Sequence, residues 1–217
     1  MNREEIFNEC YERNLFQGKI SKSGPGSDPD QTVILKSELI KLCHDLKIDT
    51  FVDFPCGDFS WMKDIIKDLD IHTYLGMDIV KRLIEDLKCS YEDFDSVPMI
   101  FFKQADIVTD VIPNADLLLC RDCLVHLSFD SAVKALRNMA KSHVKYFLMT
   151  TFTNDKWKNV DFEDGTNWYP INMTKSPFNL PMPGSWINEH CTECNGGYSD
   201  KSLGLWTNDE LKKACGI

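Results

Sequence analysis

The chain has 217 residues, of which 43% are hydrophobic and 27% are charged, a balance typical of a folded globular domain. This balance excludes fibrous, collagen-like and wholly disordered proteins. Its 24 Lys and Arg residues against 34 Asp and Glu residues give a net charge of −10. Because such a surface repels phosphate and anionic lipid, neither a nucleic acid nor a membrane is expected as a partner.

Residues 1–48 are expected to supply N-terminal helices and a covering loop. Residues 1–13 favour a short helix, and residues 17–30 predict a surface loop because they are rich in Gly, Ser and Pro. From residue 32 to residue 46 the apolar side chains recur at helical spacing, which predicts an amphipathic helix.

Residues 49–151 alternate between predicted strands and predicted helices. Strands that alternate with helices predict a parallel sheet, and an uninterrupted apolar run such as 117–120 fits a strand buried on both faces. We therefore expect an α/β fold with a doubly wound sheet. The expected strands are 50–54, 72–78, 99–104, 115–120 and 144–151, and the expected helices lie near 60–69, 80–89 and 129–141.

Residues 152–217 lose this alternation. Residues 152–183 are dense in Asn, Asp, Trp and Pro, which predicts a long functional loop. The apolar segments 186–189 and 203–206 can add a terminal antiparallel pair to the same sheet, and a helix is expected to start near Thr207. Because the chain has no internal repeat, we expect one domain over residues 1–217.

Acidic residues follow three successive predicted strands, where a doubly wound sheet binds its ligands. They are Asp53, Asp78 and Asp106, and the turn after Asp53 contains Gly57. A single aspartate at a strand end is most often a helix cap or a turn former, but three in register point to a ligand site. The G-x-G-x-x-G fingerprint and the P-loop are both absent, so nucleotide binding through pyrophosphate is not expected.

Three stretches of sequence resemble the successive motifs of class I S-adenosylmethionine-dependent methyltransferases. They are V-D-F-P-C-G-D at 52–58, L-G-M-D-I at 75–79 and A-D-L-L-L-C-R-D at 115–122. The resemblance implies a Rossmann-like methyltransferase fold, with a mostly parallel seven-stranded sheet and helices on both faces. The D-x-P-C-G-D-x-x-W-M turn, the R-D-C-L-V-H-L-S stretch and the S-K-S-G-x-G-S segment further resemble a bacterial-type subgroup associated with surface-polysaccharide sugar modification.

This resemblance implies S-adenosylmethionine as the cofactor. The turn after the first strand is expected to hold the methionine part, although Gly57 is the only glycine left where the family has three. Asp78 is expected to bind the ribose hydroxyls, and Asp106 the adenine. The full set of expected cofactor residues is Asp53, Phe54, Pro55, Gly57, Asp78, Ile79, Asp106, Ile107, Cys120, Arg121, Gln31 and Thr32.

His126 follows the fourth predicted strand, beside the place where the resemblance puts the methyl group. A single histidine on an apolar stretch is usually a core residue, but here we expect a general base, for which its ordinary pKa of about 6.5 is suitable. Arg121 and Asp122 are expected to orient the acceptor or to hold His126. The expected reaction is O-methylation of a small-molecule hydroxyl on a sugar or nucleotide-sugar.

The predicted loop 152–183 offers residues that suit such an acceptor, and we select Trp157, Asn167 and Trp168. Aromatic faces pack on sugar C–H groups, and amides pair with hydroxyls. The alternative for these residues is a surface loop anchored by its tryptophans. For the chain as a whole, the alternatives are a non-catalytic cofactor-binding or interaction module and a protein methyltransferase.

Nine cysteines include two C-x-x-C pairs, at 120–123 and 191–194, the second adjoining His190. Such pairs can bind zinc, but the first belongs to the methyltransferase-like motif, and we expect no metal. An odd number of cysteines and the lack of a secretory signal favour reduced thiols and a cytoplasmic protein, either a monomer or a homodimer.

Overall fold

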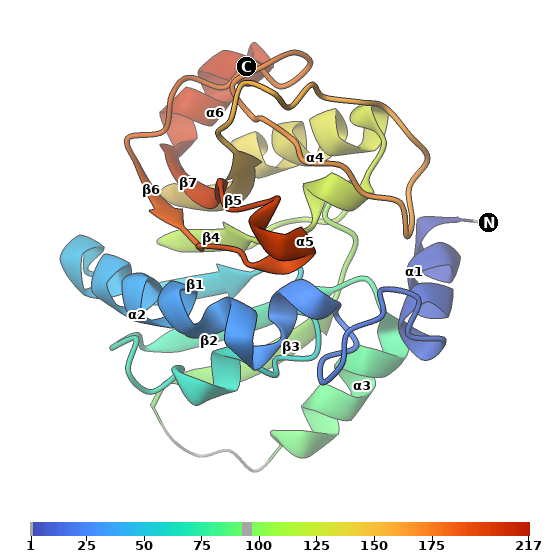
Figure 1. Ribbon diagram of the computed structural model, residues 1–217. Helices are drawn as coiled ribbons and strands as arrows, with labels where there is room; N and C mark the ends of the chain where they lie inside the picture. The colour runs from blue at the N-terminus through green and yellow to red at the C-terminus, as the bar shows by residue number, and fades with distance from the viewer. Residues whose placement is uncertain (1, 93–96) are drawn as a thin grey trace.

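The computed structural model describes residues 2–92 and 97–217, and its centre is a sheet of seven strands (Figure 1). The strands are β1 (Thr50–Asp53), β2 (Thr73–Asp78), β3 (Met99–Gln104), β4 (Leu117–Cys120), β5 (Tyr146–Phe152), β6 (Ser185–Asn188) and β7 (Lys201–Thr207). Their order across the sheet is β3-β2-β1-β4-β5-β7-β6. Strands β1 to β5 run parallel, whereas β7 is antiparallel to both β5 and β6. The expected doubly wound sheet and its terminal antiparallel pair are confirmed.

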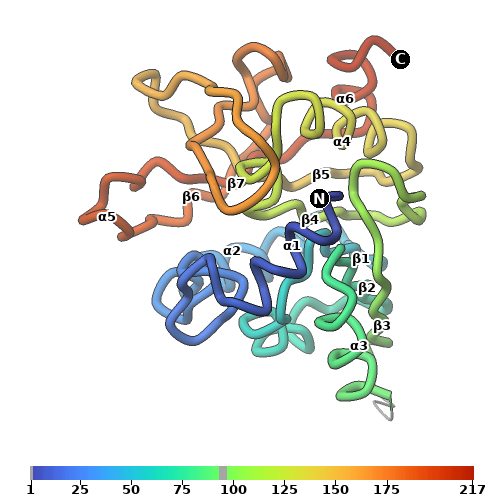
Figure 2. Tube along the Cα trace, turned by 90° about the vertical axis from the view of Figure 1, so that its right-hand side faces the viewer, coloured from blue at the N-terminus to red at the C-terminus, as the bar shows by residue number. Residues whose placement is uncertain are grey.

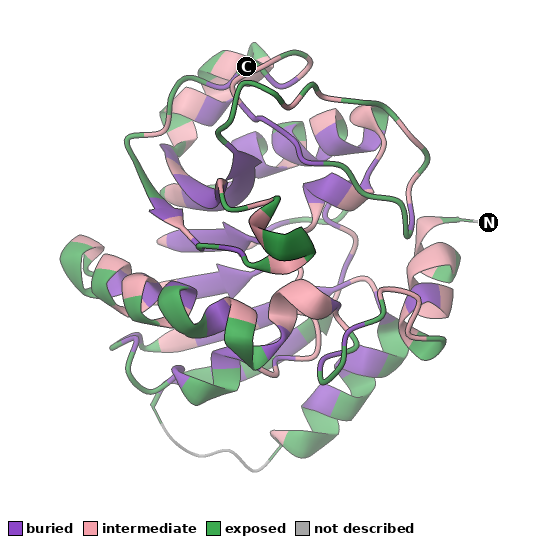
Figure 3. Cartoon of the chain, viewed as in Figure 1, coloured by how far each residue is buried: buried purple, intermediate pink, exposed green. Residues whose placement is uncertain are grey.

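Helices cover both faces of this sheet, as expected. They are α1 (Arg3–Glu12), α2 (Pro29–Leu46), α3 (Lys81–Ser90), α4 (Phe129–Lys141), α5 (Glu193–Gly196) and α6 (Asn208–Cys215), with 3-10 turns η1 (Pro25–Ser27), η2 (Met62–Asp64) and η3 (Leu124–His126). Helices α2 and α3 pack into the core on one face, and α4 and α6 into the core on the other. Figure 3 shows the central strands buried between these layers, whereas β3 and β6 at the edges of the sheet carry exposed residues.

Neighbouring residues of β1 show how the sheet supplies both cores. Val52 belongs to the core under α4, and Phe51 belongs to the core under α2, because successive side chains of a strand point to opposite faces. Asp116 ties the start of this strand to β4, since its carboxylate accepts from the backbone N–H groups of Asp49 and Thr50, at 3.1 and 2.9 Å. The end of β1 is thereby fixed beside the end of β4.

The prediction of a helix near residues 60–69 is wrong. Only the three residues of η2 are helical there, and the backbone bonds run from Ile65 N–H to Met62 O and from Asp68 N–H to Ile65 O, the i to i+3 pattern of tight turns. The apolar spacing that suggested a helix is satisfied instead by burial of Trp61, Met62, Ile65, Ile66 and Leu69. Tertiary packing therefore overrides the local helical pattern in this short connection.

Helix α1 lies beyond the carboxyl ends of the parallel strands, where Figure 2 shows it between α2 and α3. The structure gives it a capping box, in which the Asn2 side chain accepts from Glu5 N–H and the Glu5 side chain accepts from Asn2 N–H. The expected helix over residues 1–13 is thus present, although Met1 lies outside the described residues.

Among the described residues, every helix is too short or too polar to span a membrane.

Candidate functional site

A cavity of about 130 Å³ opens at the carboxyl ends of β1, β2, β3 and β4. We call it the strand-end cavity. The residues that line it come from the three turns that the sequence singled out, together with α1 and the loop before α2. Nine of the residues expected to bind a cofactor line it: Asp53, Phe54, Pro55, Gly57, Asp78, Ile79, Asp106, Ile107 and Arg121.

Asp78, at the end of β2, is buried in the wall of this cavity. Its carboxylate accepts from Gly57 N–H at 3.1 Å and from Val80 N–H at 2.9 Å. Burial raises the pKa of Asp78 to about 6, against the opposing effect of these backbone donors. A carboxylate offers about four acceptor positions, so Asp78 can still accept from a hydroxyl group of a ligand.

Asp53, at the end of β1, is also buried in this wall, and it accepts a hydrogen bond of 2.7 Å from the Tyr74 hydroxyl. Burial raises the pKa of Asp53 to about 7, although Tyr74 and Arg121 both lower it. Two neighbouring strand ends thus present carboxyl groups that titrate near neutrality. Such perturbed groups in a cavity are typical of functional sites.

Asp106 has a partner that the sequence analysis missed. The Arg3 guanidinium, on α1, lies 2.5 Å from the Asp106 carboxylate and also donates to Asp164 at 2.9 Å and to Ser131 at 2.8 Å. Arg3, Phe7 and Tyr11 of α1 line the strand-end cavity. The only sequence signal for this is the i, i+4 spacing of the two aromatic residues, which places them on one face of a helix. Helix α1 is therefore a wall of the site.

The segment from Ser21 to Asp28, which we call the cover loop, closes another side. Ser23 Oγ accepts from Asp58 N–H at 2.9 Å, and Ser21 Oγ donates to the Asp58 carboxylate at 2.8 Å. A side chain at Gly57 would begin 2.4 Å from Ser23 Oγ, and the φ of Gly57 is +53°. The single glycine left in this turn is therefore the one at which the cover loop approaches the backbone, as only glycine allows here.

His126 ends η3 with its ring beside the strand-end cavity. Its Nδ1 lies 3.2 Å from the backbone carbonyl of Asn167, and its ring packs edge-on against Phe16 with centroids 4.9 Å apart. Burial lowers the pKa of His126, against the opposing effect of Asp122. Since a carbonyl only accepts, Nδ1 carries the proton of the neutral ring, and Nε2 is left to accept one.

A second cavity, of about 310 Å³, adjoins the first, and we call it the adjoining cavity. Phe16, Ser23, Asp122 and His126 line both cavities and form their common boundary. The lining of the adjoining cavity includes three aromatic side chains, Phe152, Trp168 and Tyr198. Two ligands bound in the two cavities would meet at His126.

Of the three residues expected to bind an acceptor, only Trp168 lines this cavity. Trp157 donates from Nε1 to the Asp200 carboxylate at 3.0 Å and stacks on Tyr198 with centroids 5.6 Å apart. Asn167 contributes its backbone carbonyl to His126. The alternative weighed for the loop, anchorage by a tryptophan, therefore describes Trp157.

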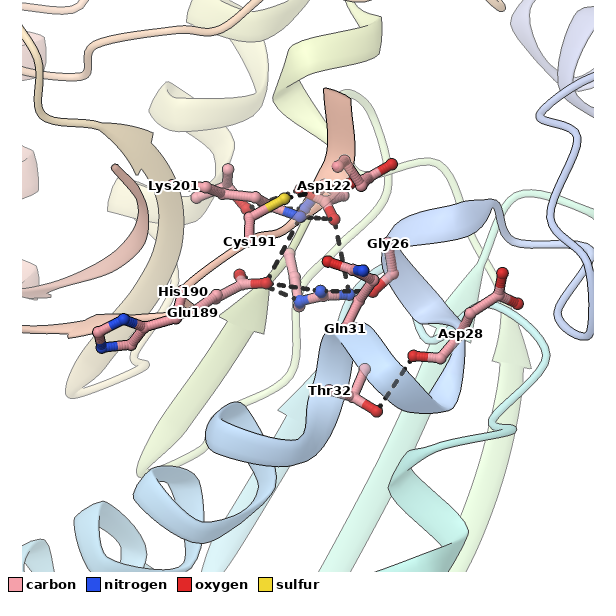
Figure 4. Close-up of polar contacts among 12 residues, drawn as sticks. Gly26, Asp28, Gln31, Thr32, Asp122, Glu189, His190, Cys191 and Lys201 are labelled. Carbon is pink, nitrogen blue, oxygen red and sulfur yellow. Dashed lines mark hydrogen bonds and ion pairs between the residues drawn. The ribbon is translucent and has the colours of Figure 1, made fainter. Parts of the chain in front are cut away.

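Arg121, Asp122, Glu189 and Lys201 form a charge cluster that includes Asp122 of the common boundary. Figure 4 labels Asp122, Glu189 and Lys201. Lys201 Nζ lies 2.5 Å from Asp122, and Arg121 donates to Glu189 at 2.6 Å and to the carbonyl of Gly26 at 2.7 Å. Desolvation of Asp122 would raise its pKa, but Lys201 and Arg121 outweigh this effect and lower the pKa of Asp122 to about 2. Arg121 thus anchors the cover loop, a role that the sequence did not predict.

Three of the expected cofactor residues, Gln31, Thr32 and Cys120, are absent from the lining of the strand-end cavity. Because α2 begins at Pro29, Gln31 and Thr32 lie in its first turn. The Gln31 amide donates to Thr192 Oγ1 at 2.7 Å, and the buried Thr32 hydroxyl bonds to backbone carbonyls of its own helix. Cys120 is buried in the core at the end of β4, and its neighbour Cys123 lines the cavity instead.

The two C-x-x-C pairs do not form a metal centre among the residues that the structure describes, where no group of three or more His, Cys, Asp or Glu side chains is arranged to hold a metal ion. All nine cysteines are free thiols. The first pair lies at the end of β4, and the second lies around α5.

No family model and no curated protein matches the sequence, but solved structures match the fold. Human N-acetylserotonin methyltransferase in complex with SAM has a TM-score of 0.64 at 14% identity, covering 95% of this chain and 60% of that one. The N-methyltransferase NodS from Bradyrhizobium japonicum WM9 with S-adenosyl-L-homocysteine also has a TM-score of 0.64 at 14% identity, covering 94% of this chain and 98% of that one.

Magnesium protoporphyrin IX methyltransferase from Synechocystis PCC 6803 with bound SAM has a TM-score of 0.51 at 12% identity, covering 76% of this chain and 81% of that one. The chain therefore has the Rossmann-like fold of SAM-dependent methyltransferases. It spans only 60% of the human enzyme's chain. At these identities the likeness concerns the fold, and a shared fold does not by itself assign an activity.

Proposed function

We propose that this protein is an S-adenosylmethionine-dependent methyltransferase that modifies a hydroxyl group of a small molecule, with His126 as the general base. The observation that carries this proposal is the pair of adjoining cavities whose common boundary includes His126 and Asp122. The fold supports it, because the three solved structures described above are methyltransferases crystallised with SAM or S-adenosylhomocysteine.

The strand-end cavity suits S-adenosylmethionine by the chemistry of its walls. Asp78 can still accept from a ribose hydroxyl, and apolar side chains such as Leu83 and Ile107 can flank a purine. Asp53 and Asp78 add carboxyl groups on the side where a cationic ligand would lie. Once bound, the cofactor supplies an electrophilic methyl group.

His126 is proposed to take the proton from the acceptor hydroxyl. Burial lowers the pKa of His126, so its ring is neutral near pH 7, and the Asn167 carbonyl favours the tautomer that carries its proton on Nδ1. Asp122 would stabilise the imidazolium that forms, since its own pKa of about 2 keeps it ionised. Phe16 packs on the His126 ring, and residues of the cover loop line the same boundary, so a bound acceptor would be partly shielded from water there.

The acceptor is proposed to be a ring with several hydroxyl groups, of the sugar class. Phe152, Trp168 and Tyr198 offer aromatic faces to ring C–H groups, and Asp122 and Glu193 offer hydrogen-bond acceptors to hydroxyls. A protein acceptor is another alternative from the sequence, but the placement of these aromatic residues in the lining of a cavity favours a small molecule.

Calorimetric titration with S-adenosylmethionine and with S-adenosylhomocysteine tests the cofactor. We expect micromolar affinity, about −8 kcal/mol, for at least one of them. The absence of binding by both would refute the proposed function. If they bind, a screen of hydroxylated acceptors with radiolabelled S-adenosylmethionine tests the activity, and binding without transfer to any acceptor would favour the non-catalytic module.

A further inference from the structure

The lining of the adjoining cavity includes one carboxylate, Glu193, that forms no ion pair within 4 Å among the described residues. Two carboxylates, Asp122 and Glu193, and one ammonium group, Lys201, line this cavity. Lys201 is 6% exposed and lies 2.5 Å from Asp122 and 3.5 Å from Glu189, so its charge is already balanced inside the protein. An anionic ligand would find no available cation there.

Glu193, in contrast, is partly exposed, and its carboxylate accepts only a weak contact of 3.4 Å from the Cys191 thiol among the bonds of the described residues. Asp122 remains 27% exposed in spite of its ion pairs. The described residues that line the adjoining cavity therefore carry a net charge of −1, from two carboxylates and one ammonium group. This field attracts cations and repels phosphate groups.

Aromatic rings lie beside these carboxylates. Trp168 and Tyr198 meet edge to face with centroids 4.9 Å apart, and both line the cavity, as does Phe152. Trp168 is 38% exposed, so part of its ring is open to a ligand. Aromatic faces attract ammonium groups through their quadrupole, and the attraction grows when the site excludes water.

We propose that the adjoining cavity takes a hydroxylated ring that carries a protonated amino group, and that Glu193 and the Trp168–Tyr198 pair select for that positive charge. This inference rests on the proposed function, because it treats the adjoining cavity as the acceptor site. It separates two acceptors that the sequence left together: an amino-substituted sugar fits the cavity, whereas a nucleotide-sugar brings a diphosphate that the cavity repels.

Ligand-observed NMR titrations with glucosamine, glucose and glucose 6-phosphate test this inference, since the three share one ring and differ in charge. We expect protonated glucosamine to bind about fivefold to tenfold more tightly than glucose, and glucose 6-phosphate to bind most weakly. In the Glu193→Gln variant the preference for glucosamine over glucose should fall to about twofold or less.

The matched control is Glu163→Gln, which removes the same charge from an exposed residue of the neighbouring loop that lines neither cavity. This variant should keep the preference. Equal affinities for glucosamine and glucose, tighter binding of glucose 6-phosphate, or no binding of glucosamine would overturn the inference.

Titrations repeated with S-adenosylhomocysteine present separate the two proposals. Binding of S-adenosylhomocysteine without a preference for glucosamine would overturn the inference and leave the proposed function standing. A preference for glucosamine in a protein that binds neither S-adenosylmethionine nor S-adenosylhomocysteine would refute the proposed function, and with it the role of the cavity as an acceptor site.

Discussion

The ammonium group of Lys201, at the start of β7, lies 2.5 Å from the carboxylate of Asp122, which follows β4. Both side chains belong to a cluster with Arg121 and Glu189, and the cluster holds two positive and two negative charges. Arg121 and Glu189 are 4% and 1% exposed. Removing one member leaves an unpaired buried charge, which is more costly than the pair itself is worth.

Lys201→Met is therefore expected to lower the free energy of unfolding by about 3–5 kcal/mol. Adding Glu189→Gln should recover part of this loss, because Arg121 and Asp122 then balance each other. Urea unfolding of the two single variants and the double variant measures the coupling. Losses that simply add would show that the cluster does not act as a unit.

His126→Gln removes the proposed base but keeps a polar side chain. We expect the turnover number to fall by about 10² to 10⁴, with the affinity for S-adenosylhomocysteine nearly unchanged. Because burial lowers the pKa of His126, the rate of the unmodified chain should rise with pH and become level at a pH below the ordinary range of histidine. The exposed His143, changed to Gln, is the control, and an equal loss in that variant would remove His126 from the mechanism.

Asp78→Ala should weaken the binding of S-adenosylhomocysteine by about 1.5–3 kcal/mol, the value of hydrogen bonds to a charged group. Calorimetry on the variant and on Asp86→Ala provides the comparison, since Asp86 is an exposed aspartate on α3. If both variants bind as tightly as the unmodified chain, Asp78 does not contact the ligand.

Arg3→Ala should loosen α1 over the strand-end cavity, because Arg3 joins Asp106 to Asp164. We expect S-adenosylhomocysteine to dissociate about tenfold faster, with a smaller change in its association rate. Stopped-flow displacement measures both rates. Arg13→Ala is the matched control, because Arg13 forms its ion pair with the exposed Glu9 of the same helix. An equal effect there would exclude a specific role for Arg3.

The raised pKa of Asp53 should make the free energy of unfolding depend on pH. Its pKa in the folded chain is about 7, above the ordinary 3.8, so the folded state binds the proton more tightly than the unfolded state. The stability that this proton gives is complete below about pH 4 and is lost as the pH rises to about 7. Relative to Asp53→Asn, the free energy of unfolding of the unmodified chain should fall over that range and then stay constant. A constant difference between the two proteins would mean that Asp53 ionises normally.

Local sequence determined the sheet and the residues at its strand ends. Strand periodicity placed Asp53, Asp78 and Asp106 correctly, because the residue that follows a parallel strand must lie at the carboxyl edge of the sheet, whatever the rest of the chain does. The same argument places His126 beside the cavities, since it follows β4 closely.

Contacts between distant segments were decided only by the tertiary structure. Arg3 reaches Asp106 across 103 positions, and Lys201 reaches Asp122 across 79, so no local pattern could indicate either pair. Gln31 and Thr32 bond to Thr192 and to the backbone of their own helix. The first turn of a helix can face either a cavity or its own neighbours, and sequence spacing does not distinguish these directions. The sequence determines which edge of the sheet carries the site, and long-range packing determines which side chains enclose it.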